Sequence, residues 1–140
     1  MPEYNKDINL SIVTQLFPIL ELRIRNFVSM LGIFPYKIDG KHFMQCNDPS
    51  SLLRELLLMI YGEQGGFENV PDIMFVYQSM YNSNFLNVRN ECIHGRGCID
   101  GMGLRTAFKL TLLCIYMIDF RIKTSEENVS DLMWGSNLDL

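Results

Sequence analysis

Between Asp7 and Leu31 the apolar residues recur every three or four positions, and this spacing constrains the fold more than any other feature of the sequence. A period of this kind predicts an amphipathic helix with one face in a core. Asp7 or Ser11 can cap its start, and Gly32 can end it. Pro18 falls in the middle and predicts either a kinked helix or two consecutive helices.

The same periodicity returns further along the chain. The expected helices span residues 52–62, 72–83, 84–94 and 104 to about 123, with Ser50 or Ser51 capping the first and Pro71 suited to the first turn of the second. Residues 33–49 carry turn residues and predict a loop. Because no run of β-branched residues alternates and no Asn-Gly hairpin occurs, we expect an all-α bundle of four or five helices with a kinked first helix.

Formal charge divides the chain into two regions. Residues 1–124 carry 12 basic and 12 acidic side chains, whereas residues 125–140 carry four acids and no base, which is the whole net charge of −4. We expect one helical domain over residues 1–124 and a flexible acidic tail over residues 125–140. A general nucleic-acid binder would show a basic excess, so any contact with RNA must be local.

The cysteines and the apolar runs favour a cytoplasmic protein. Four cysteines, at positions 46, 92, 98 and 114, do not form the dense framework of a small secreted domain. The N-terminal stretch "MPEYNKDINL" is polar and acidic before it becomes apolar, unlike a signal peptide. The longest apolar run, residues 110–118, is about half the ~20 residues needed to span a bilayer. These features predict reduced thiols and no membrane partner.

The segment "LNVRNECIHGRG", residues 86–97, places Arg89 on the apolar face of its expected helix. On a helical wheel, Arg89 falls within the arc formed by Phe85, Leu86, Val88, Cys92 and Ile93. An unpaired buried guanidinium costs on the order of several kcal/mol. Arg89 must therefore meet a carboxylate, for which Glu21 and Glu55 are candidates, or line a groove or a subunit interface.

His94 follows Arg89 but does not converge with it on a straight helix. It lies about 7.5 Å further along the axis and about 140° around it. Gly95 can end the helix in a left-handed cap, which frees His94 from its ideal position in the last turn. Taken singly, the simplest interpretations are a structural salt bridge for Arg89 and a histidine that interacts with the helix C-terminus.

The run Arg89-Asn90-Glu91-Cys92-Ile93-His94-Gly95 resembles the arginine-to-histidine signature of HEPN domains, in particular of subfamilies written R-N-x-x-x-H-G. The early "LELRIR", residues 20–25, also resembles the Glu-x-x-x-Arg helix of some of these families. The resemblance covers roughly residues 8–123 and agrees with an all-α core. Many HEPN domains are metal-independent endoribonucleases that act as homodimers, with the motifs of two subunits facing each other across one cleft.

The resemblance implies that Arg89 and His94 are the catalytic pair and that Asn90 supports them. A histidine can take a proton from a ribose 2′-OH or give one to the 5′-oxygen leaving group. An arginine fork can stabilise charge on the phosphate oxygens. The expected products are a 2′,3′-cyclic phosphate and a 5′-hydroxyl, and no cofactor is expected.

Further site residues are expected around this pair. Glu21 and Arg25 come from the resemblance of their helix and from the expected closeness of the first helix to the fourth. Arg96, Arg105 and Lys109 contribute to a local basic excess over residues 89–109, so we expect this patch to face RNA. Ordinary solvated surface is the alternative for Arg96 and Lys109.

The resemblance also implies a biological role and partners. The expected role is a toxin or a defence effector that cuts cellular RNA, with an antitoxin or a nucleotidyltransferase as partner. Some HEPN toxins carry, two residues after the histidine, a tyrosine that a nucleotidyltransferase modifies; here that position is Arg96, which gives the modification no target. Other HEPN domains lack catalysis, so the alternative is a helical dimerisation or interaction module within a larger protein or complex.

Two other constellations involve cysteine. His42, Cys46, Cys92, His94 and Cys98 include enough soft ligands for zinc, but their spacing matches no tight zinc knuckle, and we expect no metal site. Cys114 lies in an apolar stretch and is expected in the core.

Overall fold

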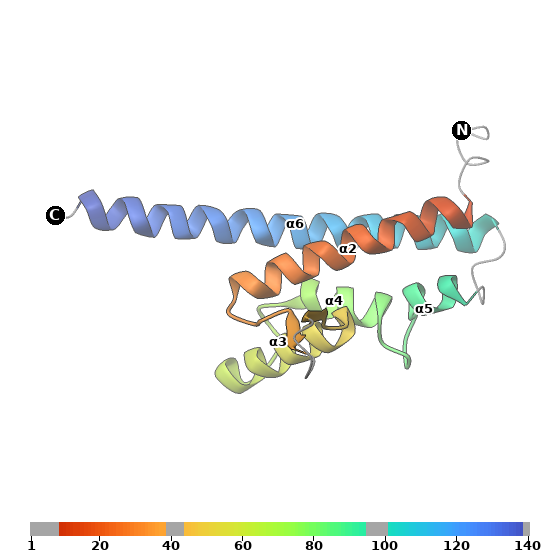
Figure 1. Cartoon of the computed structure of the whole chain (residues 1–140), viewed down its shortest axis with the longest axis horizontal. Helices are drawn as coiled ribbons and strands as arrows, with labels where there is room; N and C mark the ends of the chain where they lie inside the picture. Colours follow the sequence, from red (N-terminus) through yellow and green to blue (C-terminus); the bar gives the residue numbers. More distant parts are fainter. Residues whose placement is uncertain (1–8, 39–43, 95–100, 139–140) are drawn as a thin grey trace.

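The computed structural model describes residues 9–38, 44–94 and 101–138. In chain order the elements are α2 (Leu10–Met30), β1 (Tyr36–Ile38), β2 (Met44–Cys46), α3 (Pro49–Gln64), α4 (Pro71–Met80), α5 (Val88–Ile93) and α6 (Gly101–Leu138) (Figure 1). The expected all-α class is confirmed, since helices make up nearly all of the regular structure and the two strands have three residues each.

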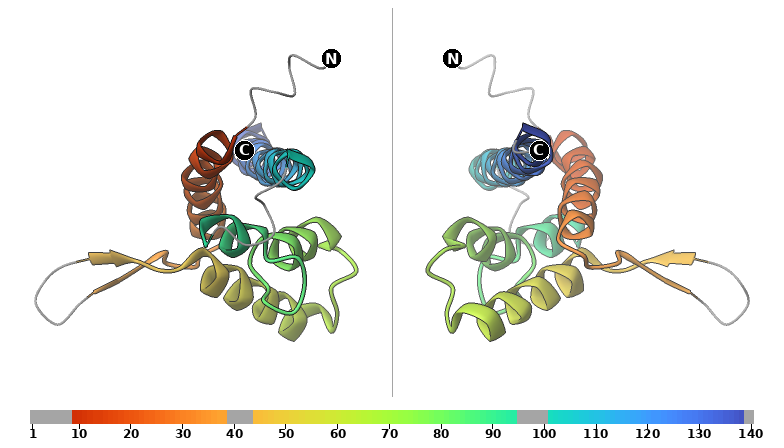
Figure 2. Two further views of the ribbon diagram at one scale, coloured as in Figure 1. Left: turned by 90° about the vertical axis from the view of Figure 1, so that its right-hand side faces the viewer. Right: turned by 90° about the vertical axis from the view of Figure 1, so that its left-hand side faces the viewer.

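The helices form two layers. Helices α2 and α6 lie side by side and run in the same direction, and α3, α4 and α5 all lie on one side of this pair (Figures 1 and 2). The core fills the space between the layers. Its fully buried large side chains include Leu20 and Ile24 of α2, Leu52 and Leu56 of α3, Ile73 and Met80 of α4, and Ile118 of α6. Removing these apolar side chains from water is the main force that holds the layers together.

Helix α2 is continuous through Pro18. The alternative of two consecutive helices is therefore wrong. Pro18 lies on the exposed face of the helix, where water can bond to the carbonyl that loses its partner. The helix begins later than Asp7 would allow, and its cap is Asn9, whose Oδ1 accepts from the N–H of Ile12 at 3.0 Å. Ser11, the other expected cap, lies inside the first turn.

Helix α3 differs from its expected limits at both ends. It passes through Gly62 and ends at Gly65, which has a left-handed φ of +76° and donates its N–H to the carbonyl of Tyr61 at 2.8 Å. Its cap is Asp48, with Pro49 in the first turn, rather than Ser50 or Ser51. A glycine within a helix is tolerated where it is exposed, as Gly62 is, so the end of α3 is set by the backbone conformation of Gly65. The expected place of Pro71 in the first turn of α4 is confirmed.

A short hairpin occupies part of the segment that we expected to be a loop, residues 33–49. Strands β1 and β2 pair antiparallel, with Tyr36 opposite Cys46 and Ile38 opposite Met44. The hairpin projects from the side of the helical layers (Figure 2). Each strand is too short for an alternating pattern to appear in the sequence, which explains why the hairpin was not predicted.

Helix α6 continues to Leu138 and so includes residues 125–138 of the segment that we expected to be a flexible acidic tail; residues 139–140 lie outside the described part. Once the first half of a helix is held by packing, each further residue adds a hydrogen bond without a new nucleation step. The last turns project past α2 and α3 (Figure 1). Across the described ranges, no helix combines the length and the apolar character that crossing a membrane requires.

Ion pairs on both flanks attach α6 to its neighbours. On one flank, Arg23 Nε of α2 lies 2.9 Å from Asp119 Oδ1. On the other, Arg121 donates from Nε and Nη2 to the two carboxylate oxygens of Asp72, both at 2.6 Å, and from Nη2 to the carbonyl of Asn69 at 3.0 Å. Partial burial tends to raise the pKa of Asp72, but the hydrogen bonds and the charge of Arg121 outweigh it, so the pKa lies below its usual value.

We expect Asp72→Asn to lower the free energy of unfolding at pH 7 by about 1–2 kcal/mol, because it removes a forked, charge-assisted pair. A carboxylate with a lowered pKa in the folded state stabilises above the pKa of the unfolded chain, and this contribution is lost as the pH falls through the folded value. The difference between wild type and Asp72→Asn should therefore shrink below about pH 4. Urea unfolding of both proteins, followed by circular dichroism at several pH values, measures this difference in the free energy of unfolding.

The matched control is Asp119→Asn, because both side chains of its pair with Arg23 are about two-fifths exposed, at 41% and 42%. Asp119→Asn should lower the free energy of unfolding by a smaller amount, under about 1 kcal/mol. A difference between wild type and Asp72→Asn that stays constant from pH 7 to strong acid would contradict the expected role of the Asp72–Arg121 pair.

Candidate functional site

Helix α5 brings Arg89 against α2. Arg89 Nε lies 3.4 Å from Glu21 Oε1, and Arg89 Nη1 donates to Asn90 Oδ1 at 3.1 Å. The expectation that Arg89 meets a carboxylate is confirmed, and Glu21 is that carboxylate; the other candidate, Glu55, is exposed on α3. The closeness of the first helix to the helix of the motif is confirmed by the same contact. The Arg89 side chain is 35% exposed and that of Glu21 is 18% exposed, while the Nε atom of Arg89 itself is buried.

His94 is the residue at which α5 ends. Its backbone N–H donates to the carbonyl of Asn90 at 3.0 Å, and its side chain is exposed. The left-handed cap that we expect at Gly95 lies outside the described residues. His94 is therefore presented to solvent by the last turn of the same short helix that carries Arg89.

Helix α5 begins later than the expected helix over residues 84–94. Asn87, just before it, is buried and has a left-handed backbone with φ +48° and ψ +45°. This conformation breaks the helical register, so Phe85 and Leu86 are exposed although the wheel placed them with the apolar residues. Val88 and Cys92 are buried as expected, whereas Ile93 is 46% exposed.

Tyr81 is a site residue that the sequence did not indicate. It follows the last turn of α4, its ring is buried, and its hydroxyl has no hydrogen-bond partner among the described residues. Burial raises the pKa of Tyr81, the negative charge of Glu21 raises it further, and the positive charge of Arg89 acts in the opposite direction. The tyrosine thus interacts with both members of the ion pair, and the three side chains come from α4, α2 and α5.

The remaining expected site residues do not all join this cluster. Arg25 directs Nη2 to the carbonyl of Asn47, at 3.4 Å, just before α3. Arg105 is half-buried and Lys109 is exposed, both on α6, and Arg96 lies outside the described residues. Among the described residues the structure therefore brings Glu21, Asn90 and Arg89 together, while Arg25 serves a different contact.

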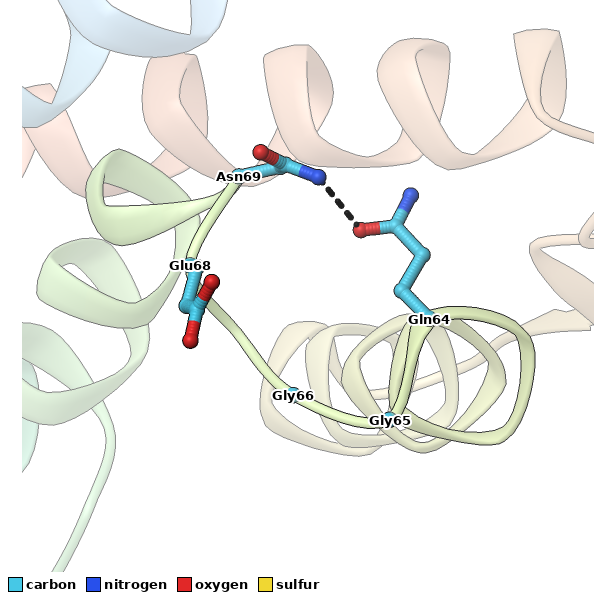
Figure 3. Close-up of a pocket in the computed structure, with 5 residues that line it drawn as sticks. All are labelled: Gln64, Gly65, Gly66, Glu68 and Asn69. Atoms are coloured by element: carbon cyan, nitrogen blue, oxygen red, sulfur yellow. Dashed lines mark hydrogen bonds between the residues drawn. The ribbon is translucent and has the colours of Figure 1, made fainter.

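A small polar hollow lies away from these residues, at the turn between α3 and α4. It has a volume of about 90 Å³ and is lined by Gln64, Gly65, Gly66, Glu68 and Asn69 (Figure 3). Asn69 Nδ2 donates to Gln64 Oε1 across its upper side at 3.0 Å. None of the expected site residues lines it, and its size suits a few water molecules.

The cysteine constellations do not add a site in the described part of the chain. There, no group of three or more His, Cys, Asp or Glu side chains is placed to hold a metal ion. His42 and Cys98, two members of the zinc alternative, lie outside the described residues. Cys114 is in the core as expected; burial raises the pKa of its thiol to about 11, and its Sγ lies 3.6 Å from Ser79 Oγ. Such a thiol is unreactive at neutral pH.

Comparison with known proteins gives no relative: no protein-family model, no curated protein and no solved structure matches this chain. The chemistry of the site must then be judged from its own groups. A partly exposed guanidinium whose direction is fixed by Glu21 and Asn90 can bind an oxyanion, and an exposed imidazole nearby in the chain can exchange protons.

A double-mutant cycle measures the contact between Arg89 and Glu21. We expect Arg89→Ala and Glu21→Ala each to lower the free energy of unfolding, with a coupling of about 0.5–1 kcal/mol, because the pair is only partly shielded from water. Chemical unfolding of the four proteins gives the coupling. Arg54→Ala, an exposed arginine of α3, is the control and should change stability by less than about 0.5 kcal/mol. A coupling of zero would show that the two charges do not interact in solution.

The backbone at Asn87 gives a second test. Asn87→Val should lower the free energy of unfolding by about 1–2 kcal/mol, because a β-branched residue resists the left-handed conformation. Asn87→Gly should change it by less than about 0.5 kcal/mol, because glycine adopts positive φ readily. Urea unfolding compares the two variants, and equal losses would mean that the side chain of Asn87, rather than its backbone conformation, sets the start of α5.

Proposed function

We propose that this chain is a metal-independent endoribonuclease of the HEPN type, which cuts RNA to 2′,3′-cyclic phosphate and 5′-hydroxyl ends. The observation that carries the proposal is that α5, a helix of six residues, carries the partly exposed Arg89 and is followed directly by the exposed His94. This is the pair of side chains that the resemblance to HEPN domains implies.

Arg89 would bind the scissile phosphate. Its guanidinium is directed by Glu21 from α2 and by Asn90 from its own helix, so its position is fixed before RNA arrives. Groups that are already oriented stabilise the developing charge of a transition state without a cost of reorganisation. The phosphate and Glu21 compete for the same guanidinium, and the partial exposure of Arg89 leaves room for that exchange.

His94 would move the protons. As a base it would take the proton of the 2′-OH, which then attacks the phosphorus, and as an acid it would protonate the departing 5′-oxygen. One histidine cannot easily reach both oxygens, which lie on opposite sides of the phosphorus. The homodimer that the resemblance implies would supply the second histidine from the partner's α5.

A chain with this activity would act in the cytoplasm as a toxin or as a defence effector, with an antitoxin as its partner. A nucleotidyltransferase partner would need a target other than a tyrosine two residues after His94, since Arg96 stands there. The acidic end of the chain is not placed to cover the site of its own protomer, because α6 runs away from α5 toward the opposite end of the molecule (Figure 1).

One observation favours a second candidate, a non-catalytic helical interaction module. The charge of Arg89 is already balanced by Glu21 within the chain, so the arginine has a structural role without any RNA. In that case the ion pair would stabilise the junction of α2 and α5, and the exposed His94 would have no catalytic task.

Cleavage of a mixed RNA pool in EDTA separates the two candidates. Wild type and the control Arg54→Ala should cut the RNA, whereas Arg89→Ala and His94→Ala should lose activity by about 100-fold or more. Analysis of the 3′ ends should find cyclic phosphate. If wild type stays inert while folded and dimeric, the interaction module is the better account; cleavage that survives in both variants would place the active site elsewhere.

A further inference from the structure

A stripe of exposed side chains runs along the outer face of α6. Its centre is apolar, with Leu113, Tyr116 and Phe120 exposed by 43%, 63% and 69%. Its ends are charged: Lys109 precedes the apolar centre, Lys123 and Glu127 follow it, and all three are exposed. Two aromatic rings at this exposure on one helix are unusual for a surface that meets only water.

The spacing of the stripe is that of a helix–helix seam. Positions 109, 113, 116, 120, 123 and 127 are separated by alternating intervals of four and three residues, the heptad pattern of a coiled coil. The flanks of α6 are already in use, since Asp119 pairs with Arg23 of α2 and Arg121 pairs with Asp72 of α4. The stripe lies between these flanks on the side away from the core, and no other described element covers it (Figure 2).

Helix α2 widens this apolar face. Ile19 and Leu22 are 44% and 52% exposed on its outer side. The Arg23–Asp119 pair fixes the register of the two parallel helices, so Ile19 lies at about the level of Ile115, next to Tyr116 in the sequence. The outer face therefore combines apolar side chains from both helices of the upper layer.

We propose that this face is a homodimer interface in which α6 packs antiparallel against α6 of a second copy. With the two-fold axis at the level of Ile118, Lys109 lies opposite the partner's Glu127 and Tyr116 lies opposite the partner's Phe120. Leu113 then lies opposite the aliphatic stem of the partner's Lys123. Each contact occurs twice, so the sequence of the stripe is complementary to itself when reversed.

The charged residues of the stripe distinguish parallel from antiparallel packing of the two α6 helices. A parallel pair would place each charged residue of the stripe against its own copy: lysine against lysine at 109 and 123, and glutamate against glutamate at 127. The antiparallel pair replaces two of these repulsive contacts by two Lys109–Glu127 ion pairs. The charges at the ends of the stripe thus favour one arrangement of a second copy.

The interface would be of modest size. From position 109 to position 127 the stripe is about 27 Å long. With Ile19 and Leu22 it offers on the order of several hundred Å² per chain, at the lower end of stable protein interfaces. We therefore expect a dimer that dissociates at micromolar concentrations.

This contact is independent of the proposed nuclease activity. The side chains of the stripe are exposed on α6, whereas α5 lies on the core side of the α2–α6 pair (Figure 2), so dimers formed through the stripe should leave Arg89 and His94 accessible. A contact that brings two α5 helices together would use a different surface. Dimerisation through α6 can accordingly be measured without RNA and can fail or succeed whatever the fate of the nuclease proposal.

A charge-reversal series with the full chain tests the proposal. Sedimentation velocity over micromolar to sub-millimolar concentrations should show wild type passing from monomer to dimer. Lys109→Glu and Glu127→Lys should each weaken the dimer by about ten-fold or more, because each places like charges opposite one another. The variant that combines Lys109→Glu with Glu127→Lys should recover most of the lost dimer affinity. Arg54→Glu, at an exposed position of α3, is the matched control and should leave the dimer affinity unchanged.

A second variant removes the apolar centre: Tyr116→Ala with Phe120→Ala should lose the association that depends on Lys109 and Glu127, with an unchanged circular dichroism spectrum because both rings are exposed. A wild type that stays monomeric, or a double charge reversal no better than the single ones, would overturn the proposal. A Lys109→Glu variant that keeps its mass but loses affinity for RNA would also overturn it, since the stripe would then serve RNA.

Discussion

The packing of α6 against α2 and α4 is the constraint on which the rest of the structure depends. Its buried face supplies Leu104, Ile115 and Ile118 to the core, and ion pairs on its two flanks set its position along both neighbours. With α6 and α2 fixed side by side, α3, α4 and α5 all pack from one side, and no described element covers the outer face of the pair. Both the candidate active site and the proposed dimer face follow from this arrangement.

The contact of Arg89 with Glu21 connects that scaffold to α5. It resolves the difficulty that an arginine stands among apolar residues, because α2 provides a carboxylate at the point where Arg89 faces it. The same contact has two consequences for function. It orients the guanidinium, which favours phosphate binding, and it neutralises the guanidinium, which an incoming phosphate must overcome. Tyr81, whose buried hydroxyl senses both charges, makes this cluster more enclosed than the exposed His94.

Periodicity predicted the helices with long packed faces, because their apolar residues repeat over several turns. Periodicity predicted the limits of helices less well where the backbone conformation of a single residue sets them. The left-handed residues Gly65 and Asn87 set the end of α3 and the start of α5, and nothing in the apolar pattern marks them over Gly62 or Asn84. Glu21 was identified as a partner because a charge requires one, whereas Tyr81 reaches the cluster only through the packing of α4 against α5. The helical course of residues 125–138 was missed since these residues have no apolar period.

The central claim is that the phosphate of an RNA strand binds at Arg89 within reach of His94. The most direct measurement is nuclear magnetic resonance of the nitrogen atoms of these two side chains during titration with an RNA whose 2′-OH at the cleavage site is replaced by hydrogen, so that binding occurs without cleavage. The account predicts that the resonances of Arg89 Nε and of the His94 ring both shift and saturate together as Glu21 gives way to phosphate. Saturating RNA that leaves both resonances unmoved would contradict it.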